Sequence, residues 1–365
     1  MSQLRTVHVL GGGSAGSSAH VSSLAAGLVA RGVHVTVCAP AGLDRFHHFA
    51  GTGACFAPVP RRSDPAAVAA LRTACATADV VHAHGPHAAV RAALALGGRR
   101  IPLVVTWHAR AHAEGARARL LRLMERRAAR AAAVVLGTTS ELVDRARMRG
   151  ARDARLSPVS APVTHPDDRI DPAKTRAELG AVGRSLVFSY GSLVPHHGYD
   201  LLFDAARAWR DPGTAPLLIV AGEGRQRQAL QRRIRDEELP VRLIGEREDI
   251  AELLTAADLA VLPSRWEARS VLAQQALRLG VPLVATAVGG VPELVGDGAE
   301  LVPYGNAEAL ARTVTGLLGD PERRAQLVAA GRSQAASWPT EDDTIVQVLS
   351  VYDELTRPPV MPRAR

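Results

Sequence analysis

The sequence predicts an α/β protein made of two doubly wound, Rossmann-like domains in tandem. Short, nearly all-apolar runs alternate with Ala-, Leu- and Arg-rich stretches, as expected for parallel strands covered by helices on both faces. Residues 157–171, rich in Pro, Ser and Asp, interrupt this alternation and indicate a linker. With 365 residues the chain is long enough for two cores. We expect domains at 1–165 and 166–340, and a C-terminal helix and tail at 341–365.

The individual elements follow from the same alternation. In the first domain we expect strands at 4–10, 33–38, 79–82, 101–106 and 132–136, with helices in the gaps. In the second we expect strands at 185–190, 216–221, 241–244, 259–262 and 281–285, with helices such as 201–209 and 271–279. Two helical segments, 321–337 and 341–355, follow without a strand between them. They should pack outside or cross back to the first domain.

Composition excludes several classes of protein. A hydrophobic content of 47% argues against disorder and fibrous structure. The three cysteines, Cys38, Cys55 and Cys75, lack CxxC spacing, which excludes a disulfide framework and a thiolate zinc site. The first apolar stretch is too short for a signal peptide, and no run approaches membrane-spanning length. We expect a cytoplasmic protein, at most peripheral on the inner face of the membrane.

The charge is unevenly distributed along the chain. Of the 44 basic and 36 acidic residues, 21 and 8 lie in residues 1–165, which leaves 23 and 28 for the rest. The first half therefore carries +13 and the second −5. This asymmetry alone fits a phosphorylated substrate, an anionic membrane or a nucleic acid at the first half. Lys174 is the only lysine, so the arginine count itself reflects base composition more than function.

One predicted helix is both basic and amphipathic. Arg119, Arg122, Arg126 and Arg130 recur at three- and four-residue spacing, with leucines between them. Such a stripe is usually a solvated face. Its functional alternative is contact with anionic lipid or with a phosphorylated acceptor.

A glycine-rich loop, 11–16, follows the first expected strand. Glycines such as Gly12 and Gly13 let backbone N–H groups at a helix N-terminus approach an anion. The second strand ends without the Asp or Glu that would hold a nicotinamide ribose, and there is no Walker lysine. A dinucleotide dehydrogenase is therefore disfavoured.

Eleven of the 13 histidines lie in the first half. HExxH is absent and no nearby carboxylate completes a ligand set around His82, His84 and His87, so we expect no metal site. We expect His84 and His108 just past the carboxyl ends of strands, where open α/β sheets bind ligands. There His108 can give a proton or hydrogen bond to a substrate, although a structural role fits its position equally well.

The second half carries six short motifs in a fixed order. They are GSLVPHHGYD at 191–200, IVAGEG at 219–224, LIGE at 243–246, LPSRWE at 262–267, GVPLVAT at 280–286 and GGVPE at 289–293. Over residues 185–320 this order resembles the donor domain of family-4 glycosyltransferases, retaining enzymes of the GT-B fold. The first half resembles them more loosely, through the glycine loop, residues 79–84 and Thr106-Trp107-His108.

The resemblance implies a GT-B fold whose two domains face a central cleft, and transfer of a sugar from a nucleotide diphosphate donor without a metal. The partners it implies are a nucleotide sugar and a small-molecule or lipid-linked acceptor, with no nucleic acid. It implies catalytic roles for His108 and Glu267 and acceptor contacts for Gly12, His20 and His84. It implies donor contacts for Gly13, Ser192, His197, Gly222, Glu223, Gly245, Arg265, Arg269, Ser270, Val271 and Gln275.

Some donor-site positions depart from the family pattern. Ser192 and His197 stand where the family has Arg and Lys, and Gln275 replaces the second of two glutamates. The usual Gly-Phe-Gly reads Ala-Arg-Ser at 268–270, and Pro-Asn-Gly reads Pro-Val-Ser at 158–160. Each lost cation removes a charge-assisted contact worth about 1.5–3 kcal/mol.

These departures keep two further functions open. One is a GT-B pseudo-enzyme that binds sugar, nucleotide or a partner without chemistry; the other is a sugar-nucleotide epimerase on the same fold. Retention of Glu267 and His108 favours a transferase in which His197 and an arginine handle the diphosphate. Loss of the Arg and Lys favours the pseudo-enzyme.

Overall fold

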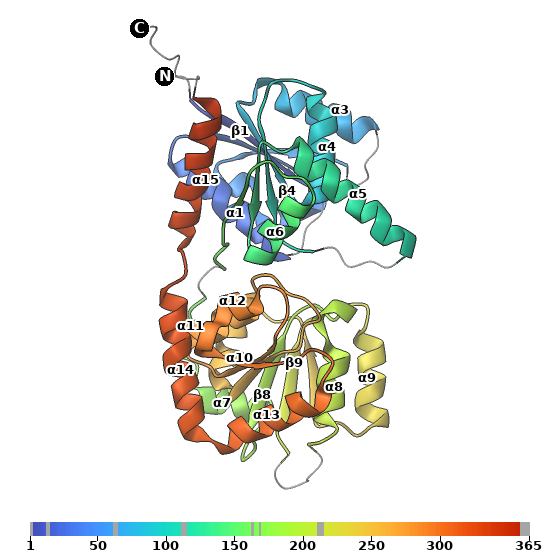
Figure 1. The fold of residues 1–365 in the computed structure, drawn as a ribbon. Helices are drawn as coiled ribbons and strands as arrows, with labels where there is room; N and C mark the ends of the chain where they lie inside the picture. Colours follow the sequence, from blue (N-terminus) through green and yellow to red (C-terminus); the bar gives the residue numbers. More distant parts are fainter. Residues whose placement is uncertain are drawn as a thin grey trace, which may run out of the picture. The chain divides into compact units, whose positions relative to one another are not determined.

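The computed structural model describes residues 3–11, 15–60, 65–110, 115–161, 164–167, 169–209 and 215–357. Internal contacts divide the chain into two compact units (Figure 1). Unit 1 is Met1–Ser160 together with Pro339–Arg365, and unit 2 is Ala161–Trp338. The first boundary thus falls inside the Pro- and Ser-rich segment, a few residues before the expected position.

Unit 1 is built on a parallel sheet in the order β3-β2-β1-β4-β5-β6-β7. The strands are β1 (Arg5–Leu10), β2 (His34–Ala39), β3 (Cys55–Pro58), β4 (Val80–His84), β5 (Leu103–Trp107), β6 (Val134–Gly137) and β7 (Ala154–Leu156). The strand order reverses between β1 and β4. Open α/β sheets bind ligands at the carboxyl ends of two such strands.

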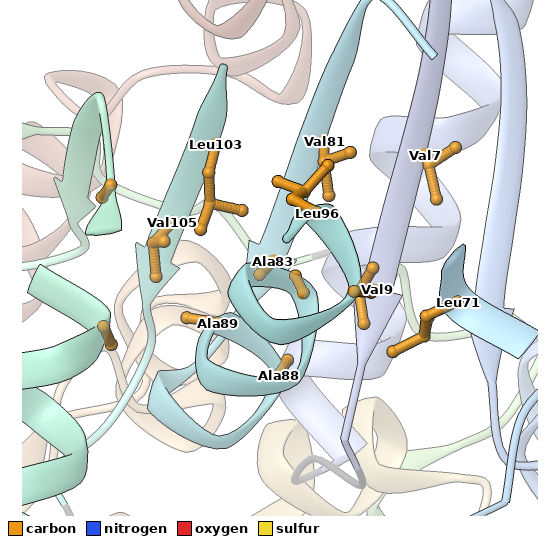
Figure 2. Close-up of a cluster of buried hydrophobic side chains, with 14 of the residues drawn as sticks. Val7, Val9, Leu71, Val81, Ala83, Ala88, Ala89, Leu96, Leu103 and Val105 are labelled. Carbon is orange, nitrogen blue, oxygen red and sulfur yellow. The ribbon is translucent and has the colours of Figure 1, made fainter. Parts of the chain in front are cut away.

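Helices cover both faces of this sheet. They are α1 (Ala15–Ala30), α2 (Ala41–His47), α3 (Pro65–Ala74), α4 (Pro86–Leu96), α5 (Gly115–Ala131), α6 (Ser140–Met148) and α15 (Glu341–Thr356). Because side chains alternate along a strand, Val81 and Val105 pack with residues of α3 and α4 on one face (Figure 2). Their neighbours Val80 and Val104 pack with residues of α1 and α15 on the other face.

Helix α15 lies far along the chain from the rest of unit 1 yet packs against α1 (Figure 1). A capping box between Thr340 and Asp343 starts the helix. Gly27 leaves the space for it, because a Cβ there would lie 2.1 Å from Ile345 Cδ1. An ion pair between Arg31 and Asp342 adds to the contact. The second of the two strandless helical segments therefore belongs to the first unit.

Unit 2 repeats the architecture with the sheet order β10-β9-β8-β11-β12-β13. Its strands are β8 (Leu186–Tyr190), β9 (Leu217–Ala221), β10 (Val241–Gly245), β11 (Leu259–Leu262), β12 (Leu283–Thr286) and β13 (Glu300–Val302). Its helices are α7 (Pro172–Glu178), α8 (Tyr199–Ala206), α9 (Arg227–Asp236), α10 (Ile250–Ala256), α11 (Val271–Leu279), α12 (Val291–Val295), α13 (Ala307–Gly319) and α14 (Pro321–Ala336). Here the order reverses between β8 and β11.

Both predicted Rossmann-like α/β domains are confirmed, and the ten expected strands lie within a few residues of their expected positions. Three short strands, β3, β7 and β13, were not expected. Among the helices that the structure describes, none has the length and apolarity that crossing a bilayer requires.

Candidate functional site

The loops that follow β8 and β11 meet at the carboxyl edge of the unit 2 sheet. The Arg265 N–H donates to the carbonyl oxygen of His196 over 2.8 Å. Gly198 adopts a left-handed conformation, with φ of +73°, so close to the other loop that a Cβ would lie 1.9 Å from the Pro263 oxygen. Because β8 and β11 flank the reversal of strand order, this edge is the expected ligand position.

Replacing Gly198 by alanine should disrupt this junction. The substitution combines left-handed strain, worth about 1–2 kcal/mol, with a backbone clash, so we expect about 3 kcal/mol or more of destabilisation. Gly183 is a matched control, because its φ is +69° and nothing lies within 4 Å of its Cβ position. Urea unfolding of Gly198→Ala and Gly183→Ala measures the difference; equal losses would contradict the close approach.

The turns after β9 and β10 extend the same edge. The Gly222 N–H donates to the Gly245 oxygen over 2.6 Å, and the Gly191 N–H donates to the Ala221 oxygen over 3.1 Å. A Cβ at Gly222 would lie 2.1 Å from the Gly191 oxygen, so these turns pack backbone against backbone. Gly222, Glu223 and Gly245 are thereby brought together beside the loop that begins at Gly191.

The loop after β8 holds Ser192 and His197, the two positions at which the resemblance led us to expect cations. Ser192 is exposed, and His197 ends a single 3-10 turn, Pro195–His197. The His197 ring stacks on Tyr199, with centroids 6.4 Å apart. Burial, and then the charge of His196, lowers the pKa of His197 to about 4. His197 is therefore neutral at pH 7 when no anion is bound.

Glu267 lies on the loop after β11. The Ser264 hydroxyl donates to Glu267 Oε2 over 3.4 Å, and the Gly290 N–H donates to the Glu267 carbonyl over 2.9 Å. Burial raises the pKa of Glu267 to about 7, although hydrogen bonds from Ala268 and Ser264 oppose the shift. The carboxyl group is thus poised between its two protonation states near neutral pH.

The loop leads into α11, and three predicted donor residues lie at its N-cap and in its first two turns. Ser270 caps the helix by accepting the Ala273 N–H over 3.3 Å, and Val271 begins it. Gln275 is buried and donates from Nε2 to Thr164 Oγ1 over 3.2 Å. Its Oε1 is buried without a hydrogen-bond partner among the described residues.

The two arginines expected to approach the diphosphate lie against aromatic rings. The Arg265 guanidinium is 5.8 Å from the Tyr304 ring centroid, and that of Arg269 is 5.8 Å from the Trp338 ring centroid. Burial lowers the pKa of Arg269 to about 10. Sequence reasoning missed Arg225, an exposed cation. Burial, and then the charge of Arg225, lowers the pKa of His196. Arg225 follows the Gly222-Glu223-Gly224 turn directly, which is the signal that could have found it.

Unit 1 gathers histidines at the carboxyl edge of its sheet. His84 is the last residue of β4, not a residue just past it as expected, and His108 follows β5 directly. His84 Nε2 lies 3.2 Å from His8 Nδ1, and His84 Nδ1 lies 3.2 Å from His108 Nε2. His20, from α1, places its ring centroid 5.3 Å from that of His108. The predicted acceptor residue Gly12 and the predicted donor residue Gly13 lie outside the described residues.

These imidazoles are neutral at pH 7. Burial is the largest cause of lowered pKa in each of them: to about 3 for His8, to about 4 for His20, and well below 6.5 for His84 and His108. His8 was not expected here. It lies inside an apolar strand, and only the pairing of β1 with β4 brings it beside the others.

His82 connects this cluster to the last helix. Its Nδ1 lies 2.6 Å from the Tyr352 hydroxyl on α15, and its Nε2 lies 2.7 Å from Thr106 Oγ1. Both ring nitrogens therefore have partners. Helix α15 thus fixes one ring nitrogen of His82 through the Tyr352 hydroxyl.

The basic stripe is confirmed as an outward face of α5. Its four arginines, Arg119, Arg122, Arg126 and Arg130, are all exposed. Leu120 and Leu123 are also exposed, by 58% and 49%. On the inner side, buried Glu125 pairs with Arg145 and Arg149. This face therefore offers both cations and apolar side chains to a partner.

Two family models match the chain. That described as "Glycosyl transferases group 1" matches residues 172–334, and that described as "Glycosyl transferase 4-like domain" matches residues 15–162. Among solved structures, HepE of Anabaena in complex with UDP-glucose is similar, with a TM-score of 0.83 and 22% identity. That match covers 96% of this chain and 100% of the HepE chain.

Curated relatives match shorter stretches. A GDP-mannose-dependent monoacylated alpha-(1-6)-phosphatidylinositol monomannoside mannosyltransferase of Corynebacterium glutamicum is 33% identical over 47% of this chain and 48% of its own. A D-inositol 3-phosphate glycosyltransferase of Jonesia denitrificans is 28% identical over 75% of this chain and 71% of its own. The chain thus spans about half the length of the first of these relatives. Together, the two family matches and the shared fold show that the chain belongs to the group 1 glycosyltransferases of the GT-B fold.

Proposed function

We propose that this chain is a working retaining glycosyltransferase, which moves a sugar from a nucleotide diphosphate donor to a phosphorylated or lipid-linked acceptor. The observation that carries the proposal is that the loop bearing His197 meets the loop bearing Glu267, which leads into α11 with Gln275, at the carboxyl edge of the unit 2 sheet, where the strand order reverses. The relatives' names support it: two are a mannosyltransferase and an inositol phosphate glycosyltransferase.

Each group has a role that its chemistry suits. The Gly222 and Gly245 turns allow a close approach to the donor, and Gln275 Oε1 accepts a ribose hydroxyl. Glu267, when ionised, accepts hydrogen bonds from the hydroxyls of the transferred sugar. The N-terminus of α11, at Ser270 and Val271, favours the diphosphate. No step in this scheme requires a metal ion.

Transfer breaks the bond between the anomeric carbon and a diphosphate oxygen and forms a bond from that carbon to the acceptor oxygen, while the proton of the acceptor hydroxyl passes to the departing diphosphate. Negative charge grows on the departing diphosphate, so cations aimed at it accelerate the step. We assign this task to His197, once protonated, and to Arg225, with Arg265 and Arg269 as the further candidates on the loop after β11. His108 and His84, with His20 and Gly12, orient the acceptor.

His197 should make nucleotide binding depend on pH. An anionic diphosphate stabilises the imidazolium, so the bound pKa rises from about 4 and binding takes up a proton. Affinity should therefore increase as the pH falls from about 7.5 to about 6, by up to tenfold per pH unit. Calorimetry in buffers of different ionisation enthalpy measures how many protons are taken up when the nucleotide binds. The His197→Ala variant should take up fewer, and an unchanged count would remove His197 from the site.

The outward face of α5 should bind anionic membrane. Changing Arg119, Arg122 and Arg126 together to glutamine should weaken binding to phosphatidylglycerol-containing vesicles by more than tenfold at low salt, since each cation contributes about 1 kcal/mol. Changing the exposed arginines Arg232, Arg235 and Arg312 of unit 2 to glutamine is the matched control. Vesicle sedimentation measures both. Equal binding by the two triple variants would exclude α5 as the membrane contact.

The test of the proposed function is the product. Incubation with the preferred nucleotide sugar and phosphatidylinositol or inositol phosphate acceptors, followed by NMR, should show a glycoside with the donor's anomeric configuration. An inverted product would refute the retaining mechanism. Tight donor binding without a product from any acceptor would favour the pseudo-enzyme, whose support is the neutral His197 where the family has lysine.

A further inference from the structure

Two groups of three histidines in unit 1 bring one ring nitrogen from each member within 4.8 Å of one another. One group is His8, His82 and His84, and the other is His20, His84 and His108. The sequence did not predict them, because their members come from β1, α1, β4 and the end of β5. Neutral imidazole is the form of histidine that binds metal ions.

The first group is unsuited to a metal ion. Both ring nitrogens of His82 already have partners, Tyr352 at 2.6 Å and Thr106 at 2.7 Å. All three side chains of this group are buried, which leaves an ion no route from solvent. Binding through either ring nitrogen of His82 would break a hydrogen bond inside the core.

The second group has the geometry of an open zinc site. His84 Nδ1 and His108 Nε2 lie 3.2 Å apart. Two nitrogens on one tetrahedral zinc ion, each at 2.0–2.1 Å, lie about 3.3–3.4 Å apart. The ligand atoms of this group all lie within 4.8 Å of one another. The longest separation therefore exceeds the nitrogen–nitrogen distance on zinc by at most about 1.5 Å, a difference that rotation of a side chain can close. His108 is only half-buried, so the ion can enter from its side.

A neighbouring histidine orients the central ligand. With a metal ion on His84 Nδ1, the His84 Nε2–H donates to His8 Nδ1, 3.2 Å away. A hydrogen bond of this kind from the second ring nitrogen is the usual support of a metal-bound histidine.

We propose that His20, His84 and His108 bind one divalent transition-metal ion, with zinc as the best fit. Three imidazoles fill three tetrahedral positions, and water or an anionic oxygen takes the fourth. If the proposed function holds, zinc withdraws His84 and His108 from the acceptor. The ion is then an inhibitor of transfer, not a cofactor.

The test uses untagged, chelator-treated protein, because a polyhistidine tag would itself bind the ion. A Cys55→Ser background removes the exposed thiol. Titration with Co²⁺ should give the visible absorption of a tetrahedral complex at one ion per chain, and Zn²⁺ should abolish it. His20→Ala and His108→Ala should each weaken binding about a hundredfold or more, while His34→Ala, at an exposed histidine, should not.

Circular dichroism establishes that each variant folds. His108→Ala is the variant that should perturb folding least, because His108 is only half-buried. Absence of the tetrahedral spectrum, or equal affinity in His34→Ala and His108→Ala, would overturn the proposal. Because metal binding is measured without turnover, its failure is distinct from failure of the glycosyltransferase assignment. Where transfer is observed, Zn²⁺ should inhibit it and a chelator should restore it.

Discussion

Acidification from about pH 7.5 to about pH 5 is expected to unfold unit 1. Burial lowers the pKa of His8 to about 3 and of His20 to about 4, against 6.5 in the unfolded chain. Above pH 6.5 such a histidine is neutral in both the folded and the unfolded chain and costs no stability. As the pH falls from 6.5 towards the folded pKa, the unfolded chain binds a proton that the folded chain does not, so the free energy of unfolding decreases. Each of the two costs about 2 kcal/mol by pH 5.

Three more histidines act in the same direction. His82, His84 and His108 also have lowered pKa values, and burial is again the largest cause. The total loss is comparable with the 5–15 kcal/mol that holds a typical domain together. Urea unfolding at a series of pH values, with a chelator present, measures the slope.

Matched variants assign this slope to the cluster. Near pH 5, the His20→Gln variant should take up about one proton fewer on unfolding than the wild-type chain. The His34→Gln variant, changed at an exposed position outside the cluster, should take up as many protons from the cluster as the wild-type chain does. A free energy of unfolding that stays constant between pH 7 and pH 5 would show that the histidines are not held neutral by burial.

Replacing Glu267 by alanine is expected to lower the rate of sugar transfer by about 10²–10⁴-fold. Two charge-assisted hydrogen bonds to sugar hydroxyls are worth about 3–6 kcal/mol together, and both are lost. In the wild-type enzyme the rate should also fall below pH 7, because the pKa of Glu267 is raised to about 7 and its protonated form accepts more weakly. Initial rates across this pH range measure both effects.

Two variants control for this prediction. Glu267→Gln keeps the shape of the side chain and one acceptor oxygen but cannot ionise, so it should transfer sugar slowly. Its rate should also lack the fall below pH 7 (the acid limb) that we assign to Glu267. Glu308→Ala removes an exposed glutamate of α13 and should leave the rate unchanged. An acid limb of unchanged pKa in Glu267→Gln would mean that another group produces it.

The central strands could be predicted from the sequence because helices cover both of their faces, which requires continuous apolar runs. The short strands β3, β7 and β13 lie at or near the sheet edges, where one or few pairing neighbours suffice and polar residues are tolerated. They contain Pro58, Arg155 and Glu300, residue types that interrupt an apolar run and indicate a loop. Edge strands of this kind have little periodic signal.

The candidate site could be predicted in part for a related reason. Parallel strands bring their carboxyl ends to one edge, so the order of the motifs predicts that the turns at Gly191, Gly222 and Gly245 meet. The sequence does not predict in the same way where a long side chain points. Arg269 packs on Trp338, which is remote in sequence. His8 needed the register between β1 and β4, which places it opposite His82.

The most direct test of the donor site is calorimetric titration with a panel of nucleoside diphosphates and their sugars, GDP-mannose and UDP-glucose among them. The account predicts that one nucleotide sugar binds tightly, and that Glu267→Ala and His197→Ala each weaken this binding at least tenfold. Absence of binding across the panel, or binding that neither substitution affects, would contradict a donor site at the carboxyl edge of unit 2.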